Sequence, residues 1–152
     1  PILPEDNAGT MHDKLMEAGA NLLVTTVKGL ADGTLREIPQ TQASNEPLKH
    51  APKIFREDTI IDWQQPGQQI HNQIRGLSPH PAASTQLAGK GVKLYTTRWE
   101  AATHHATPGS YETDHQQWLR FAATDGWLYV QDLQLEGKTR LAITDFLRGF
   151  RG

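Results

Sequence analysis

Residues 117–135 read QWLRFAATDGWLYVQDLQL, and two strand-like runs here flank the dipeptide Asp125-Gly126. Asp-Gly between two such runs is the strongest short-range signal for a β-hairpin, because both central residues of the tight turn need a positive φ. Residues 83–99 repeat the arrangement, and we expect Gly89-Lys90-Gly91 to form a three-residue hairpin loop there. Several short strands separated by turns predict a small barrel or sandwich.

A short helix precedes the first of these strands. Ile70, Ile74 and Leu77 recur at i, i+4 and i+7, which places them on one face of a helix. Pro79 and Pro81 then end the helix and deliver the chain into a strand, because residues before proline avoid the α region. One helix interleaved with about five strands suits an oligonucleotide-binding barrel. The sequence therefore predicts an α+β, mostly β fold: a small oligonucleotide-binding-like Greek-key β-barrel with a helical N-terminal lead-in.

The N-terminal lead-in is predicted to be helical from about residue 7 to residue 34. Thr10 followed by Asp13 resembles a capping box, with Asp in place of the usual Glu or Gln. Leu23, Val27 and Leu30 form an apolar stripe, and a single helix needs a partner to cover such a stripe.

Two glycines and a polar segment divide this part of the chain. Gly19 could split the helix in two, and Gly33 suits the position just after a helix. Residues 36–52 are polar and contain three prolines, so we expect an extended linker. The chain opens on PILPED and not on Met, which together with the uncovered stripe suggests a piece of a longer protein.

Composition sets limits on the function. The formal net charge is −2, with a mildly basic C-terminal end, far from the strongly basic footprint of a dedicated nucleic-acid protein. There is no cysteine, which excludes disulfides and thiolate chemistry and fits a cytoplasmic protein. We see neither a signal peptide nor an apolar run long enough to span a membrane.

Four polar residues are candidates for chemistry. His104, His105 and His115 could contribute to a metal site, but their spacing matches no helical or strand ligand pair, and we expect solvated loop histidines. Arg75 could hold a phosphate or carboxylate, or it could tie the helix end to a neighbouring backbone carbonyl. We favour the structural role for Arg75.

The pair Asp62-Trp63 could combine a functional carboxylate with an aromatic platform, but no second acid–base group or pocket is visible. We expect Trp63 to anchor the core and Asp62 to cap the following helix. Other aromatic residues could stack bases, although on a small barrel they are more often core or half-buried surface. They are Tyr95, Trp99, Tyr111, Trp118, Trp127 and Tyr129.

Three stretches carry a family resemblance when they are taken together in this order and spacing. They are APKIFREDTIIDW (51–63), IHNQIRGLSPHPAA (70–83) and LQLEGKTRLAITDFLRG (133–149). They resemble the C-terminal part of methionyl-tRNA formyltransferases. The lead-in TMHDKLMEAGANLLVTTVKGLADGT (10–34) resembles the last helical segment of that family's catalytic domain.

The resemblance implies a division into three parts. Residues 1–35 would be the C-terminal remnant of a Rossmann-like formyltransferase domain, 36–52 the linker, and 53–152 the oligonucleotide-binding-like barrel domain. Members of the family transfer a formyl group from 10-formyltetrahydrofolate to methionyl initiator tRNA. Their catalytic residues and folate-binding loop lie upstream, so the resemblance implies that this chain contains no catalytic, cofactor-binding or metal-binding residue, is inactive alone, and partners the missing catalytic domain.

The resemblance also implies candidate RNA-binding residues. Lys53 matches a lysine that the family uses at the end of the linker, and Arg151 matches a basic residue after the final helix. Lys138 and Arg140 follow LQLEG, where the family usually has two or three consecutive basic residues, and Thr139 interrupts that run here.

Two alternatives to a tRNA-orienting fragment stay open. The segment could belong to a formyltetrahydrofolate dehydrogenase or a sugar-nucleotide formyltransferase, which carry similar C-terminal parts. The barrel could instead be a purely structural module that packs against a catalytic domain, and the mild charge favours this reading.

Overall fold

The computed structural model describes residues 1–39, 47 and 50–151, which fall into two compact units. One unit combines Pro1–Gly9 with Phe55–Gly152, and the other is Thr10–Ile54. Both hairpin sequences lie in the first unit, which we call the sheet unit.

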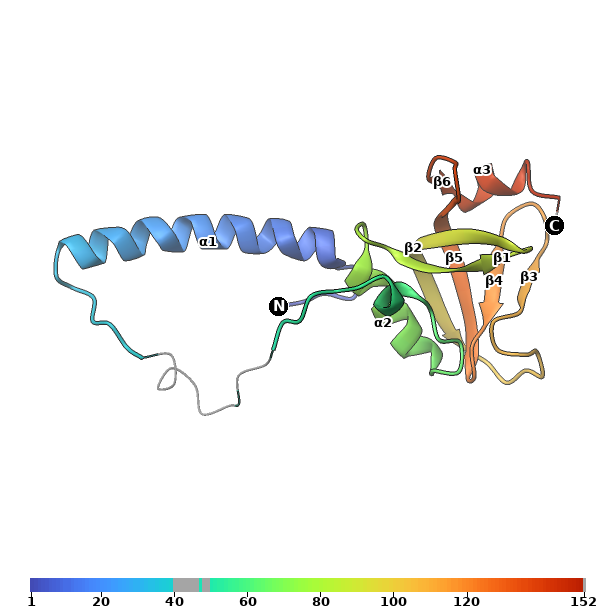
Figure 1. Cartoon of the computed structure of the whole chain (residues 1–152), viewed down its shortest axis with the longest axis horizontal. Coiled ribbons are helices and arrows are strands. Elements are labelled where there is room, and N and C mark those ends of the chain that lie inside the picture. Colours follow the sequence, from blue (N-terminus) through green and yellow to red (C-terminus); the bar gives the residue numbers. More distant parts are fainter. Residues whose placement is uncertain (40–46, 48–49, 152) are drawn as a thin grey trace. The chain divides into compact units, whose positions relative to one another are not determined.

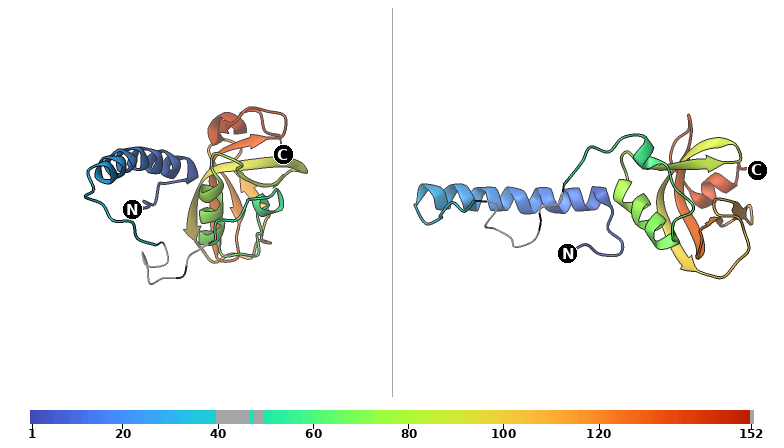
Figure 2. Two further views of the ribbon diagram at one scale, coloured as in Figure 1. Left: turned by 60° about the vertical axis from the view of Figure 1, so that its left-hand side comes forward. Right: turned by 60° about the horizontal axis from the view of Figure 1, so that its bottom comes forward.

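An antiparallel sheet of six strands forms the sheet unit (Figure 1). The strands are β1 (Ala83–Leu87), β2 (Lys90–Ala101), β3 (Tyr111–Thr113), β4 (Leu119–Ala122), β5 (Gly126–Leu135) and β6 (Leu141–Ala142). Their order is β1-β2-β5-β4-β3, and β6 pairs with β5. Because β3, β4 and β5 are sequential neighbours and β2 lies beside β5, the connection is a Greek key. The sheet curls like part of a barrel (Figure 2), which confirms the predicted α+β, mostly β fold class.

The inner face of the curled sheet and two helices enclose the core. From α2 (Gly67–Leu77) come Ile70, Ile74 and Leu77, as the helical spacing predicted. From α3 (Ile143–Leu147) come Phe146 and Leu147. The other buried apolar residues of this cluster are Ile61, Ala83, Leu87, Val92, Leu94, Leu119, Phe121, Ala123, Leu128, Val130 and Leu133.

The first hairpin has a shorter loop than predicted. Leu87 pairs directly with Lys90, so the loop consists of Ala88 and Gly89, whose φ angles are 49° and 75°. Positive φ at both central residues is the signature of the two-residue type I′ turn, and Ala88 adopts it despite its Cβ. The predicted loop Gly89-Lys90-Gly91 is therefore wrong, because Lys90 and Gly91 already belong to β2.

The second hairpin is present, but its loop is Thr124-Asp125, one residue earlier than predicted: the N–H of Ala123 donates to Gly126 O, and Gly126 already begins β5. This hairpin also fixes α2. Asp125 Oδ1 accepts a hydrogen bond from the backbone N–H of Gly67, the first residue of α2, at 2.7 Å. The first amides of a helix have no partner within the helix, so this long-range contact satisfies one of them. Phe121 of the preceding strand stacks on Trp63 with 4.8 Å between ring centroids, which confirms Trp63 as a core anchor.

Asp62 does not cap α2. Its carboxylate accepts hydrogen bonds from the side chain of Gln65 and the backbone N–H of Gln64, both at 3.0 Å. These bonds, with the Gln65 bond first, lower the pKa of Asp62 below its ordinary value. Asp62 therefore stabilises the turn before the helix, between η2 (Glu57–Thr59) and α2, and the predicted capping role was wrong.

The lead-in forms one long helix, α1 (Ala8–Ala31). It starts before Thr10, so the predicted capping box is wrong, and it continues through Gly19 without a break. After the helix Gly33 has a φ of 68°, and its N–H donates to Leu30 O while that of Thr34 donates to Gly29 O. This pair of hydrogen bonds is the Schellman arrangement expected of a C-terminal glycine.

No residue of α1 is buried, and the predicted stripe of Leu23, Val27 and Leu30 is at least half exposed, at 65%, 56% and 50%. Most of the predicted linker 36–52 lies outside the described residues. None of the helices in the described ranges combines the length and apolarity needed to cross a membrane.

Candidate nucleic-acid interface

Three of the four predicted RNA-binding residues lie on the C-terminal segment of the sheet unit. Lys138 is exposed in the turn between β5 and β6, Arg140 precedes β6, and Arg151 is exposed after α3. Lys53 is exposed and belongs to the unit Thr10–Ile54.

The β5–β6 turn meets the β1–β2 turn at one corner of the sheet. The N–H of Glu136 donates to Gly91 O at 2.9 Å, and Lys93 faces Gln134 across the β2–β5 ladder. The Gln134 side chain in turn donates to Lys138 O at 2.7 Å. The backbone therefore brings the Cα positions of Lys90, Lys93 and Lys138 to one corner, which we call the lysine corner, although Lys90 and Lys93 leave β2 on opposite faces.

Sequence reasoning missed two of the three residues of this corner. Lys90 and Lys93 belong to a different hairpin from Lys138, and only the register of β2 against β5 unites them. Among the described residues, none of these lysines forms an ion pair; Lys93 Nζ donates to the carbonyl oxygen of Pro81 at 3.2 Å. The lysine corner therefore offers three positive charges that phosphates could neutralise, beside one carboxylate, that of Glu136, which lies against Gly91.

Arg140 differs from Lys138 because its charge already forms an ion pair. Its Nε forms a short hydrogen bond and ion pair with Asp132, and its guanidinium lies 4.2 Å from the centroid of the Tyr95 ring. Asp132 pairs in the β5–β6 ladder with Ala142, two residues after Arg140. This arrangement closes the base of the turn, so Arg140 has less free charge for a phosphate than the lysines have.

A row of cationic and aromatic side chains crosses β2 and β5 at the end opposite to the lysine corner. Arg98, Tyr129, Arg120 and Glu112 face one another in sequence across β2, β5, β4 and β3. Arg120 bonds Glu112 at 2.6 Å and Tyr129 Oη at 2.8 Å, and it lies 3.9 Å from the Trp127 ring centroid. The pKa of Arg120 is raised by Glu112 and Tyr129 against the opposing effect of burial. Such cross-strand pairs stabilise a sheet, and each arginine here is already neutralised.

Two of the three candidate metal-binding histidines lie against different aromatic rings. The ring of His104 is tilted against that of Trp127, with 4.5 Å between centroids, and hydrogen bonds with Gly126 O at 3.0 Å, while His115 stacks on Phe150 at 6.2 Å. In the part of the chain that the structure describes, no group of three His, Asp, Glu or Cys side chains is placed to hold a metal ion.

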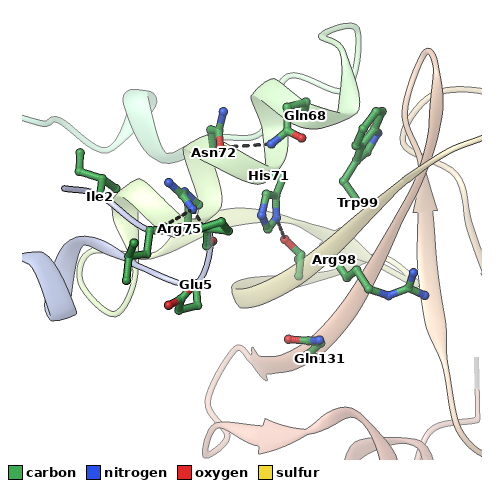
Figure 3. Close-up of a pocket in the computed structure, with 12 residues that line it drawn as sticks. Ile2, Glu5, Gln68, His71, Asn72, Arg75, Arg98, Trp99 and Gln131 are labelled. Carbon is green, nitrogen blue, oxygen red and sulfur yellow. Dashed lines mark hydrogen bonds between the residues drawn. The ribbon is translucent and has the colours of Figure 1, made fainter.

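A groove of about 630 Å³ lies between residues 2–5, α2 and β2 (Figure 3). His71 stands in the middle of it, and its Nδ1 is 2.9 Å from Thr97 Oγ1. Burial, assisted by the charge of Arg75, lowers the pKa of His71 below its ordinary value of 6.5. The ring is therefore neutral at pH 7, and protonating it opposes folding.

The lowered pKa of His71 predicts a pH dependence of stability. In the unfolded chain His71 takes up a proton near pH 6.5, whereas the folded chain holds it neutral to a lower pH. The contribution of His71 to the free energy of unfolding is therefore complete above pH 6.5 and is lost as the pH falls towards the pKa of His71 in the folded chain. His71→Gln should flatten this loss between pH 7.5 and 5.5 in urea unfolding. An unchanged pH dependence in this variant would contradict the assignment.

Residues 53–151 match the family model described as formyl transferase, C-terminal domain. The chain belongs to this family of formyltransferase C-terminal domains. Its relatives include the methionyl-tRNA formyltransferases of Parabacteroides distasonis, 42% identical over 99% of this chain, and of Bacillus velezensis, 41% identical over 95%. These alignments cover 49% and 45% of the relatives, so the chain spans about half of their length and corresponds to their C-terminal half. The predicted resemblance is thereby confirmed.

Solved structures support the fold. A variant of HypX from Aquifex aeolicus matches 97% of this chain and 27% of its own, with a TM-score of 0.68 and 16% identity. HypX in complex with tetrahydrofolic acid matches 84% of this chain and 23% of its own, with a TM-score of 0.59 and 18% identity. At this identity the likeness concerns the fold alone.

Proposed function

We propose that this chain holds and orients the tRNA within an enzyme that formylates methionyl initiator tRNA in the cytoplasm, with 10-formyltetrahydrofolate as co-substrate. The observation that carries the proposal is 42% identity, over 99% of the chain, to a protein named methionyl-tRNA formyltransferase. In this proposal residues 1–35 complete the catalytic domain, 36–52 link it to the sheet unit, and the catalytic and folate-binding residues lie upstream. The chain alone is then inactive.

In the proposed function, contacts between this chain and the tRNA phosphates position the reacting end of the tRNA. The reacting amine is at the end of a long polyanion, so phosphate contacts far from the chemistry can position it and lower the entropic part of the barrier. The lysine corner and Arg151 support such contacts, because among the described residues they form no ion pair. Lys53 would add a contact from the linker. Arg140, paired with Asp132, would contribute least.

A filter-binding titration of this chain with initiator tRNA, over a series of salt concentrations, tests the proposal. Each phosphate contact contributes roughly 0.7–0.9 to the slope of log affinity against log salt. Replacing Lys90, Lys93 and Lys138 together by Ala should therefore reduce the slope by about 2.1–2.7. Lys53→Ala and Arg151→Ala should each reduce it by about 0.7–0.9, and Arg140→Ala by less.

A matched control lies on the same strand. Arg98→Gln also removes one positive charge from β2, but eight residues beyond Lys90, or about 26 Å at the usual rise of a strand. Arg98 is paired with Glu100 at 2.6 Å, so its loss should leave the slope unchanged. Absence of binding even at low salt, or an equal response to the control, would overturn the proposal.

One observation favours a structural module as the second candidate. Arg98, Arg120, Arg140 and Arg148 each form an ion pair with an acidic side chain, which leaves little excess charge on much of the sheet unit. A structural module would show no tRNA binding in the titration, and a longer enzyme carrying the lysine variants would retain full affinity for tRNA.

A further inference from the structure

The segment that precedes α1 is fastened to the end of α2. Arg75 Nη1 donates to the carbonyl oxygen of Leu3 at 3.2 Å and also to that of Pro4, and Figure 3 shows the guanidinium directed at this segment. Further along, the N–H of Gly9 donates to Ser78 O at 3.0 Å. The two attachments use neighbouring residues of one helix end, Arg75 and Ser78.

The segment is folded so that it presents its carbonyl groups to Arg75. Asp6 is only 4% exposed, and its Oδ2 accepts a hydrogen bond from the N–H of Leu3 at 2.7 Å. The N–H of Asp6 donates back to Leu3 O at 3.0 Å. This reciprocal pair closes residues 3–6 into a turn before the chain meets Arg75.

The second attachment requires glycine at position 9. A Cβ at Gly9 would lie 2.6 Å from Cδ of Pro79, closer than such atoms approach in proteins. Gly9 is also in the first turn of α1, where backbone N–H groups have no partner within the helix. The carbonyl of Ser78 therefore satisfies an amide of α1 only because the two backbones can come together here.

Arg75 is used differently from the arginines of the strands. Arg98, Arg120 and Arg140 pair with carboxylates, whereas Arg75 forms no ion pair among the described residues and bonds neutral carbonyls. Its position in the last turn of α2 is favourable for a cation because of the helix dipole.

We propose that residues 1–9 form a clip that fixes the polypeptide to the sheet unit at a second place, ahead of α1, with Arg75 and Gly9 as its positioning residues. The chain leaves the sheet unit after Gly9 and rejoins it at Phe55, so the clip lies immediately before the point where the chain first leaves the sheet unit. Residues that precede position 1 in a longer protein would then start from the surface of the sheet unit.

The purpose of the clip rests on the proposed function. A tRNA held by the sheet unit is placed for a catalyst elsewhere only if the two parts keep a fixed geometry. A polar linker alone spreads the attached part over many positions and lowers its effective concentration at any one of them. A noncovalent second attachment restricts that spread.

Hydrogen exchange of the whole chain, followed by NMR, tests the clip through the amides of Asp6 and Gly9. Arg75→Gln should accelerate exchange at both amides at least about tenfold, because charge-assisted hydrogen bonds contribute on that order. The core amide of Leu128 reports whether the variant stays folded and should exchange as before. Arg148→Gln is the matched control, since it removes an exposed arginine of α3 that pairs with Asp145. Unchanged exchange at Asp6 and Gly9 in Arg75→Gln, or an equal effect of the control, overturns the proposal.

A glycine pair tests the second attachment independently. Gly9→Ala and Gly19→Ala lie in the same helix, but a Cβ at Gly19 meets nothing within 4 Å. Only Gly9→Ala should accelerate exchange of the Asp6 amide. Equal behaviour of the two variants would overturn the role of Gly9.

The clip and the proposed function fail in different ways. Arg75→Gln should leave tRNA binding in the filter assay unchanged, because none of the proposed phosphate contacts involves Arg75. A wild-type chain that binds no tRNA would end the proposed function and leave the exchange results intact. An Arg75→Gln chain that loses tRNA binding with unchanged exchange would overturn the clip.

Discussion

Replacing Phe121 by Ala should lower the free energy of unfolding of the sheet unit by about 3–5 kcal/mol. Phe121 is completely buried, it stacks on Trp63, and its ring centroid lies 6.2 Å from that of Tyr111. Deleting the ring removes apolar area from the core and leaves a cavity between two elements that cannot close onto each other. Urea unfolding followed by Trp fluorescence measures the loss.

Phe55→Ala is the matched control for this substitution. Phe55 is 53% exposed, and surface substitutions usually change stability by no more than about 0.5 kcal/mol. If Phe121→Ala cost as little as the control, Phe121 would not be the centre of the core described above.

Gly126→Ala should destabilise the sheet unit by about 2–3 kcal/mol, the upper part of the range for overpacking. A Cβ at this position would lie 2.2 Å from the carbonyl oxygen of Glu100 and 2.9 Å from Cα of Ala101. Both are backbone atoms of β2, so no side chain can move aside, and the β2–β5 ladder must separate at its end. Urea unfolding measures the change, and amide exchange of Trp127 locates it.

Gly76→Ala should have the opposite sign. Gly76 is in the last turns of α2, and a Cβ there meets nothing within 4 Å. Alanine in a helix is favoured over glycine by up to about 1 kcal/mol, so this variant should be slightly more stable than wild type. Destabilisation of the same size at positions 76 and 126 would show that the clash with β2 is not the cause.

Local patterns in the sequence predicted the elements well. The spacing of Ile70, Ile74 and Leu77 defined the buried face of α2, and Asp125-Gly126 located the β4–β5 hairpin to within one residue. Such features depend on residues within one or two turns of each other, so a short stretch contains all of the physical information. The exact loop of the first hairpin was missed because Ala88, a residue with a Cβ, takes a positive φ.

Contacts between distant residues were the part that the sequence could not predict. Asp125 bonds the first amide of α2, where the local pattern favoured Asp62. Arg75 was expected to bond a backbone carbonyl, but nothing near it in sequence indicated Leu3 or Pro4 as the acceptor. Each partner is set by the packing of whole elements, which no periodicity encodes.

The candidate interface shows the same limit. Lys138 was a candidate from the family pattern, but Lys90 and Lys93 join it only through strand register. The pairing of Arg140 with Asp132 reduces the free charge of a residue that the pattern treated like Lys138. A count of basic residues along the chain cannot distinguish these cases, because it ignores which acids the fold places beside them.

The outer edge of β1 is partly covered by the segment of the chain that enters the sheet unit. Ile60 forms a parallel bridge with Ser84, and the N–H of Ile61 donates to Ser84 O at 2.9 Å, so the segment entering the sheet unit lies along that edge. An open edge would recruit strands from other molecules and favour aggregation. Because residues 60 and 61 of the same chain cover this part of the β1 edge, fewer open backbone groups are left there for a strand of another molecule.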